Sequence, residues 1–116
     1  MDDMLSQLYN TAMSRKNEKQ EGSYTCYLFE KGLDKILKKV GEECAETVIA
    51  AKNLETAPAD EQKKQELVGE ISDLMYHLAV MMAQTGVTPE EVNAELDKRS
   101  LKTGNLKQFH TTDKNS

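Results

Sequence analysis

Two groups of carboxylates stand on two separate helix-like stretches of this chain. The first group is Glu42, Glu43 and Glu46, and the second is Glu70 and Asp73. Residues three or four apart project from the same side of a helix, so each group presents several oxygens in one direction. Two such groups facing each other would form the kind of oxygen site that a hard divalent cation such as Mg²⁺ binds.

Apolar residues flank both acidic groups, so the acids border a face that a folded protein would bury. Two like charges about 4 Å apart repel by about 4 kcal/mol at an effective dielectric constant of about 20, whereas a whole domain is stable by only ~5–15 kcal/mol. A bound cation, raised pKa values or side chains turned toward water would each relieve this repulsion. Either pair alone also fits a solvated helix face, but their recurrence on two consecutive helices favours a metal site.

Helix carboxylates also build di-iron sites, which normally include a Glu-x-x-His pair. In this chain Glu46 stands three residues after Glu43, and Asp73 stands three residues after Glu70. An all-oxygen ligand set favours Mg²⁺ or Mn²⁺ over iron. His77, four residues after Asp73, could orient a ligand carboxylate or contact a substrate, and a packed structural histidine is the alternative.

Basic side chains offer candidate phosphate contacts. Lys39 precedes the first acidic group by one helical turn, and Arg99 stands near the end of the last predicted helix. Either one could bind a phosphate, although most basic side chains on a helical protein are simply solvated. The chain has no glycine-rich phosphate loop and no nucleophile motif, so covalent catalysis has no visible candidate.

The elements that must position these residues are helices. Apolar residues recur at steps of three and four, which predicts an all-α fold, most simply a small helical bundle. Two long antiparallel helices, over 32–54 and 61–84, are expected to carry the acids. Residues 26–31 fit a strand or helical turns, and the absence of a partner strand favours helix or irregular structure. Shorter helices are predicted over 2–16 and 89–99.

Local signals mark several helix ends. Asp60 is a candidate N-cap of the second long helix, and Gly86 is a candidate C-cap. Thr88 and Glu91 form a capping box that opens the last helix. Residues 17–25 are polar and are expected to form a loop.

The first long helix is expected to bury an apolar stripe, with the acids at its edge. Within this stripe Cys44 would pack as a small hydrophobe. The stripe consists of Ile36, Leu37, Val40, Cys44, Val48 and Ala51. Aromatic residues make up only 5% of the chain and tryptophan is absent, so the core is thin. A second subunit is therefore expected to complete the bundle, giving a homodimer or a higher homo-oligomer.

Composition narrows the class of protein. A length of 116 residues suits one domain, and a net charge of −5 argues against a partner such as nucleic acid that is held through its phosphates. The chain has two cysteines and no Cys-x-x-Cys motif, which argues against a disulfide scaffold and against a zinc site. An acidic start without a long apolar run lacks the features of a signal peptide or membrane span, so a cytoplasmic protein is expected.

Three segments of the sequence point to one family. The acidic pattern at 42–46 and 70–73 resembles that of the all-α NTP pyrophosphohydrolases. Residues 22–52, 69–82 and 91–100 resemble, more specifically, the phosphoribosyl-ATP pyrophosphohydrolases of histidine biosynthesis. The resemblance covers residues 1–100 and divides the chain into an NTP-pyrophosphohydrolase-like domain and a polar tail over 101–116.

The resemblance implies a reaction and roles for the residues. Phosphoribosyl-ATP would be hydrolysed between its α and β phosphates to phosphoribosyl-AMP and pyrophosphate, the second step of histidine biosynthesis. The implied metal ligands are Glu43, Glu46, Glu70 and Asp73. Glu42 would be a further ligand or would orient the attacking water. The segment Ser23-Tyr24-Thr25 would contribute substrate contacts.

Two other functions remain open at this stage. One is a house-cleaning pyrophosphohydrolase that acts on canonical or damaged nucleoside triphosphates. The other is a helical interaction module without enzymatic activity, in which the acids merely face water. The sequence does not distinguish among Glu42, Glu43 and Glu46 in their division of labour.

Overall fold

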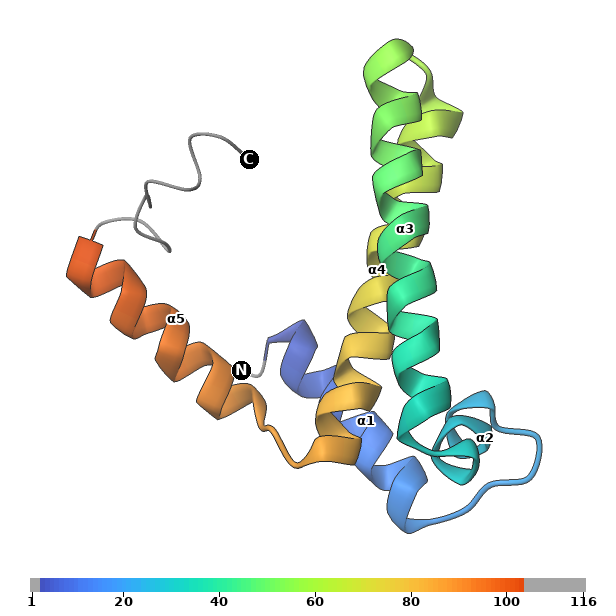
Figure 1. Ribbon diagram of the computed structural model, residues 1–116, viewed down its shortest axis with the longest axis vertical. Coiled ribbons are helices and arrows are strands. Elements are labelled where there is room, and N and C mark those ends of the chain that lie inside the picture. The colour runs from blue at the N-terminus through green and yellow to red at the C-terminus, as the bar shows by residue number, and fades with distance from the viewer. Residues whose placement is uncertain (1–2, 104–116) are drawn as a thin grey trace. The chain divides into compact units, whose positions relative to one another are not determined.

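The computed structural model describes residues 3–103, which form five helices and no strand (Figure 1). This confirms the predicted all-α fold. Within these described residues, those up to Gly86 and those from Val87 form two separate compact units. The first unit contains α1 (Met4–Asn17), α2 (Tyr24–Lys31), α3 (Leu33–Thr56) and α4 (Glu61–Thr85), and the second contains α5 (Pro89–Thr103). Most of the predicted tail over 101–116 lies outside the described residues, so that boundary remains a prediction.

The first unit is organised around the antiparallel hairpin of α3 and α4, which lie side by side along their length (Figure 1). The expected cap is present, because the Asp60 carboxylate accepts hydrogen bonds from the backbone N–H groups of Gln62 (2.9 Å) and Lys63 (3.3 Å). Gly86 ends α4 with a left-handed backbone (φ 80°), as expected of a C-cap glycine. The two long helices predicted from the sequence are therefore confirmed.

Residues 26–31, left open between strand and helix, belong to α2, which begins already at Tyr24. The loop expected over 17–25 is accordingly shorter. Ser23 caps the helix by accepting a hydrogen bond from the Cys26 backbone N–H at 3.2 Å. At the other end Gly32 adopts a φ of 91°, which a residue with a side chain rarely adopts, and this sharp turn leads directly into α3.

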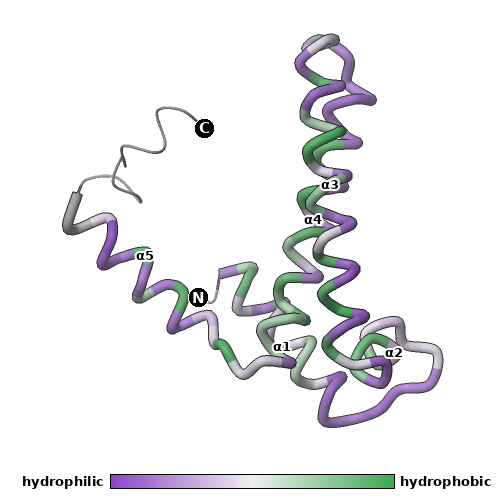
Figure 2. The backbone as a smooth tube through the Cα atoms, in the orientation of Figure 1, coloured by the Kyte–Doolittle hydropathy of each residue, from purple (hydrophilic) through white to green (hydrophobic). Residues whose placement is uncertain are grey.

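A small core fills the base of the hairpin, where α1 and α2 pack against α4 and α3. Its fully buried members are aliphatic, as the low aromatic content predicts. They are Ala12, Leu28, Ile36, Val80 and Ala83, with Tyr9, Met13, Phe29, Tyr76 and Met81 packed around them. Hydrophobic and hydrophilic residues alternate along the rest of the hairpin (Figure 2).

The apolar stripe of α3 is not buried as expected. Ile36 is buried, but Leu37, Cys44 and Val48 are exposed, Val48 to 68%. The expectation that Cys44 packs inside was wrong. The physical reason is that over most of its length α3 packs only against α4, and one neighbouring helix covers only one strip of a helix surface.

The inward strip of α3 instead contains an acid, since the buried positions of this helix are Ile36, Glu43 and Ala50. Glu43 is only 6% exposed, so it lies inside the buried face rather than at its edge.

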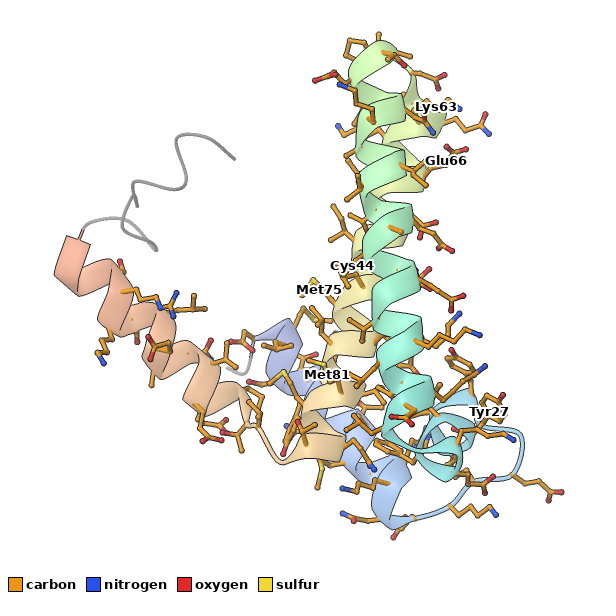
Figure 3. The ribbon with its side chains drawn as sticks, viewed as in Figure 1. Tyr27, Cys44, Lys63, Glu66, Met75 and Met81 are labelled. Atoms are coloured by element: carbon orange, nitrogen blue, oxygen red, sulfur yellow. The ribbon has the colours of Figure 1, made fainter. Side chains whose placement is uncertain are left out.

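The exposed residues of α3 and α4 form what we term the apolar face. Helical spacing puts the α3 residues of this face on one side of α3 and the α4 residues on one side of α4. Figure 3 shows Cys44 of α3 and Met75 of α4 together on one side of the hairpin. The apolar face comprises Leu37, Cys44, Val48, Val68, Ile71 and Met75.

The second unit begins with the predicted capping box. The Thr88 backbone N–H donates to Glu91 Oε1 (3.0 Å), and the Glu91 N–H donates to Thr88 Oγ1 (3.2 Å). The helix that follows runs four residues further than the predicted 89–99, to Thr103. No helix among residues 3–103 is both long and apolar enough to cross a membrane.

Candidate metal centre

Three carboxylates from the two long helices converge in the hairpin. One oxygen each of Glu43 and Glu46 on α3 and of Glu70 on α4 lies within 4.8 Å of the other two. Glu43 and Glu46 are three residues apart and so share a side of α3, which faces the turn of α4 that carries Glu70. The antiparallel pairing of the helices therefore brings together the acids that the sequence keeps 24 or more residues apart.

Two oxygens of this cluster are buried without a partner. Glu43 Oε2 and Glu70 Oε2 make no hydrogen bond in the described part of the chain. A buried carboxylate oxygen normally accepts hydrogen bonds or coordinates a cation, because it otherwise loses its solvation without compensation. The donor set is all oxygen, so a hard cation such as Mg²⁺ fits it.

The proximity of the acids changes their proton affinity. A hydrogen bond shared with Glu46, burial, and the negative charges of Glu46 and Glu43 together raise the pKa of Glu70 from 4.5 to about 7. Without a cation, the cluster therefore relieves its repulsion by holding a proton, which is one of the three solutions considered above. A cation would take the place of this proton.

Thr47 joins the two acid-bearing helices and was not singled out in the sequence. Its hydroxyl lies 2.7 Å from the Glu43 carbonyl oxygen of its own helix and 3.3 Å from the Glu70 carbonyl oxygen of α4. It thus links the backbone of α3 at Glu43 to the backbone of α4 at Glu70. The only signal in the sequence was a threonine four residues after Glu43, a spacing common to many helices.

The remaining acids lie around this cluster rather than in it. Asp73 follows Glu70 by one turn on α4, is exposed, and does not belong to the converging group. Glu42 is exposed and forms an ion pair with Lys39 (3.6 Å). Burial tends to lower the pKa of Lys39. Nearby Tyr24, Glu42 and Glu43 outweigh burial, so the pKa is raised above its usual value.

The residues expected to contact substrate on α2 and α4 are connected by hydrogen bonds. Tyr24 Oη lies 3.1 Å from His77 Nε2, and His77 Nδ1 lies 2.7 Å from the Asp73 carbonyl oxygen. The Thr25 hydroxyl is hydrogen-bonded to the Tyr76 hydroxyl. His77 is buried and hydrogen-bonded, which agrees with the structural alternative considered for it.

Two other candidates have structural partners. Ser23 caps α2, as described above. Arg99 lies on α5, in the second unit, where its Nε donates to Glu95 Oε2 at 2.9 Å. The described geometry brings together Glu43, Glu46 and Glu70. It also pairs Lys39 with Glu42 and joins Tyr24 to His77 by a hydrogen bond.

Comparison of the sequence with known proteins identifies the family of the chain. The model of the phosphoribosyl-ATP pyrophosphohydrolase family matches residues 5–100. The chain belongs to this family. The match includes both acid-bearing helices and the α2 segment, so the resemblance inferred from the sequence is confirmed.

Individual relatives of the family agree. A phosphoribosyl-ATP pyrophosphatase of Streptococcus thermophilus is 54% identical over 103 residues, which span 89% of this chain and 91% of the relative. The phosphoribosyl-ATP pyrophosphatase of Clostridium novyi is 47% identical over 105 residues, spanning 90% of this chain and 88% of the relative. The one from Listeria monocytogenes is 53% identical over 96 residues, spanning 83% of this chain and 84% of the relative. The phosphoribosyl-ATP pyrophosphohydrolase family thus accounts for nearly the whole described chain.

Proposed function

We propose that this chain hydrolyses phosphoribosyl-ATP to phosphoribosyl-AMP and pyrophosphate, with the acid cluster of the hairpin as its active site. The observation that carries the proposal is the convergence of Glu43, Glu46 and Glu70, two of them with an unpartnered buried oxygen, in a member of this family. The reaction belongs to histidine biosynthesis, and we place the enzyme in the cytoplasm.

The residues present fit a bound Mg²⁺, or Mn²⁺ in its place. Glu43, Glu46 and Glu70 would hold the ion, and Asp73, one turn beyond Glu70, would join them on rotation of its exposed side chain. When bound, the ion would neutralise phosphate charge and lower the pKa of a coordinated water. The carboxylates alone repel a polyphosphate, so the substrate requires this compensation.

The protein's own side chains supply the rest of the chemistry. Glu42 is exposed beside the cluster, where its carboxylate would orient the attacking water. Lys39, paired with Glu42, would offset charge on the phosphates and on the leaving pyrophosphate. Water attacks the α phosphorus as the bond to the β-phosphate oxygen breaks, so no covalent intermediate with a side chain is needed.

We further propose that two copies of this chain associate through the apolar face. Its residues are exposed along both long helices, with Val48 exposed to 68%. An exposed apolar surface that continues along a hairpin is typical of a subunit interface. By helical spacing Glu42 and Glu46 project from the other side of α3, while Glu43 points inward, so association through this face leaves the exposed acids accessible.

The test of the function is a substrate panel with purified protein and Mg²⁺. Phosphoribosyl-ATP should release pyrophosphate with a higher kcat/KM than any canonical or damaged nucleoside triphosphate. A deoxynucleoside triphosphate hydrolysed much faster than phosphoribosyl-ATP would show a house-cleaning enzyme instead. If titration calorimetry detects no heat with Mg²⁺ or Mn²⁺, with or without nucleotide, the helical interaction module is the better account.

A further inference from the structure

Tyr24 connects the turn before α2 with the acid-bearing hairpin. It is the first residue of α2 and is 44% exposed, yet its hydroxyl reaches the buried side chain of His77 on α4 at 3.1 Å. The three-carboxylate cluster can form without this contact, because none of its members takes part in it.

The direction of this hydrogen bond follows from the other nitrogen of the imidazole. His77 Nδ1 lies 2.7 Å from the Asp73 carbonyl oxygen, and a carbonyl oxygen can only accept. Nδ1 therefore carries the hydrogen, and in the neutral ring Nε2 has none. Tyr24 must then donate its single hydroxyl hydrogen to Nε2.

The ring of His77 is held in this orientation by its surroundings. It is 5% exposed and makes edge-to-face contacts with the rings of Tyr76 (4.9 Å between centroids) and Tyr24 (5.8 Å). Turning the imidazole over would place a carbon at the Asp73 carbonyl oxygen and so break this short hydrogen bond. In the neutral ring Nε2 is therefore held as the acceptor that faces Tyr24.

With its hydrogen committed to His77, the Tyr24 oxygen can act toward any further group only as an acceptor. An ionised phosphate oxygen has no hydrogen to donate, so it gains nothing from this oxygen. A ribose hydroxyl or a purine N–H does have a hydrogen and can bind to it. As a hydrogen-bond acceptor, the Tyr24 oxygen thus favours the nucleoside part of a nucleotide over its phosphates.

Tyr24 also lies beside the acid-bearing part of α4. Its partner His77 is hydrogen-bonded to the Asp73 carbonyl oxygen, and Asp73 follows Glu70 of the cluster by one helical turn. Burial raises the pKa of the Tyr24 phenol, so the phenol keeps the hydrogen that it donates to His77. A nucleotide held by its phosphates near Glu43 would extend its sugar and base through the neighbourhood of Tyr24.

We propose that Tyr24 is a specificity-determining residue, whose hydroxyl oxygen accepts a hydrogen bond from an O–H or N–H of the substrate's nucleoside part. His77 is the positioning residue that fixes this polarity. The inference rests on the proposed hydrolysis of phosphoribosyl-ATP and adds to it the side chain that recognises the nucleoside.

The first experiment compares two phenylalanine variants on the same helix. Tyr24→Phe should raise KM for phosphoribosyl-ATP by about threefold to tenfold, the contribution of one hydrogen bond, with kcat changed by less than about twofold. Tyr27→Phe, which removes the hydroxyl of an exposed tyrosine one turn after Tyr24, is the control and should leave both constants unchanged. An active enzyme in which Tyr24→Phe has the KM of the parent overturns the inference, whereas a parent that does not hydrolyse the substrate overturns the proposed function instead.

The second experiment identifies the donor. Analogues of phosphoribosyl-ATP that lack the 2′-hydroxyl, the 3′-hydroxyl or the purine 6-amino hydrogen are compared in the parent and in Tyr24→Phe. The analogue that lacks the donor should raise KM in the parent but add nothing in Tyr24→Phe, because the two changes remove the same bond. Effects that multiply for every analogue would contradict a direct contact.

The third experiment tests whether the Tyr24 hydroxyl oxygen accepts a hydrogen bond from the substrate or from Lys39. His77→Asn keeps a donor for the Asp73 carbonyl but lacks the Nε2 acceptor, so it should raise KM as Tyr24→Phe does. The double variant should have a KM close to that of Tyr24→Phe alone. In a Lys39→Met background the effect of Tyr24→Phe should persist. If that effect vanishes there, the oxygen serves Lys39 and not the substrate, and the inference fails. Should His77→Asn not fold, as judged by thermal unfolding, the Tyr24 and Lys39 variants still decide.

Discussion

Glu43 on α3 and Glu70 on α4 face each other across the hairpin, and each keeps a buried carboxylate oxygen without a hydrogen-bond partner. Buried polar atoms without partners are rare in folded proteins, and they commonly mark a site whose ligand completes them.

Replacing Glu70 by glutamine should abolish most of the activity. The amide is neutral and binds Mg²⁺ more weakly than the carboxylate. Loss of an outer-shell partner of a metal site lowers activity about 10–100-fold, and loss of a ligand should lower kcat/KM by more than that. Pyrophosphate release and calorimetry with Mg²⁺ measure the effect. Glu55→Gln, near the exposed end of α3 in an ion pair with Lys52, is the matched control and should behave as the parent. Full activity in Glu70→Gln would refute the site assignment.

The stability of the metal-free protein should fall as the pH rises. The pKa of Glu70 is raised from 4.5 to about 7 by its hydrogen bond to Glu46, by burial and by neighbouring charge, so the folded state binds a proton that the unfolded state has already lost. This contribution is fully present below pH 4.5 and is lost as the pH passes through about 7. Thermal unfolding in a chelator, over this range of pH, measures it. Glu70→Gln should remove most of the slope, and an equal slope in both proteins would contradict the prediction.

Metal binding should depend on the same proton. Because Mg²⁺ and the proton compete for the Glu70 carboxylate, affinity for Mg²⁺ should increase up to about pH 7 and then level off. Calorimetry in buffers of different ionisation enthalpy counts the protons released. Binding that releases no proton at slightly acidic pH would show that Glu70 is not a ligand.

Thr47→Val should loosen the hairpin at the acid cluster. The variant keeps the shape of the side chain but loses the hydroxyl that contacts the carbonyl oxygens of Glu43 and Glu70. One hydrogen bond contributes about 1 kcal/mol to stability, and the acids should also become less well aligned, so Mg²⁺ affinity should fall. Thr56→Val is the control, since the Thr56 hydroxyl bonds only within its own helix, to the Asn53 carbonyl oxygen. Equal losses of Mg²⁺ affinity in the two variants would argue against a special role for Thr47.

A charge in the apolar face should separate the subunits. Val48→Asp would place a carboxylate in the proposed interface, where its desolvation is unfavourable, and sedimentation should show the monomer at concentrations at which the parent is a dimer. Ile49→Asp is the matched control, because Ile49 is also exposed, to 59%, but projects about 100° away around α3. Dissociation by both variants or by neither would locate the interface elsewhere.

The fold could be predicted largely from local signals. Asp60, Gly86 and the Thr88–Glu91 capping box each determine a helix end through backbone hydrogen bonds of neighbouring residues, and all three lie where expected. Residues 26–31 stayed open between strand and helix, because Ser23 was expected to lie in a loop and not to cap a helix. That segment is short and apolar, and it becomes helix α2 because Ser23 caps it and Leu28 packs into the core.

The candidate site was predictable in its residue types and family but not in its arrangement. The spacing of Glu43, Glu46 and Glu70 indicated a metal site, and the segments around them indicated phosphoribosyl-ATP pyrophosphohydrolases, which the family match confirms. Thr47 was missed, because its role depends on the Glu70 carbonyl oxygen of the neighbouring helix, which the sequence does not place beside it. Asp73 was grouped with the ligands by spacing, yet it lies outside the three converging carboxylates.

Sequence by itself determined the helices, their caps and the family, because these depend on contacts within a few residues or on the identity of the residues. Only the tertiary structure decided which side of each helix is buried. In α3 the inward strip contains Glu43, while Val48, part of the predicted apolar stripe, is exposed in this chain. Periodicity predicts that a helix has an apolar side, but the neighbours packed against that helix decide which side is covered.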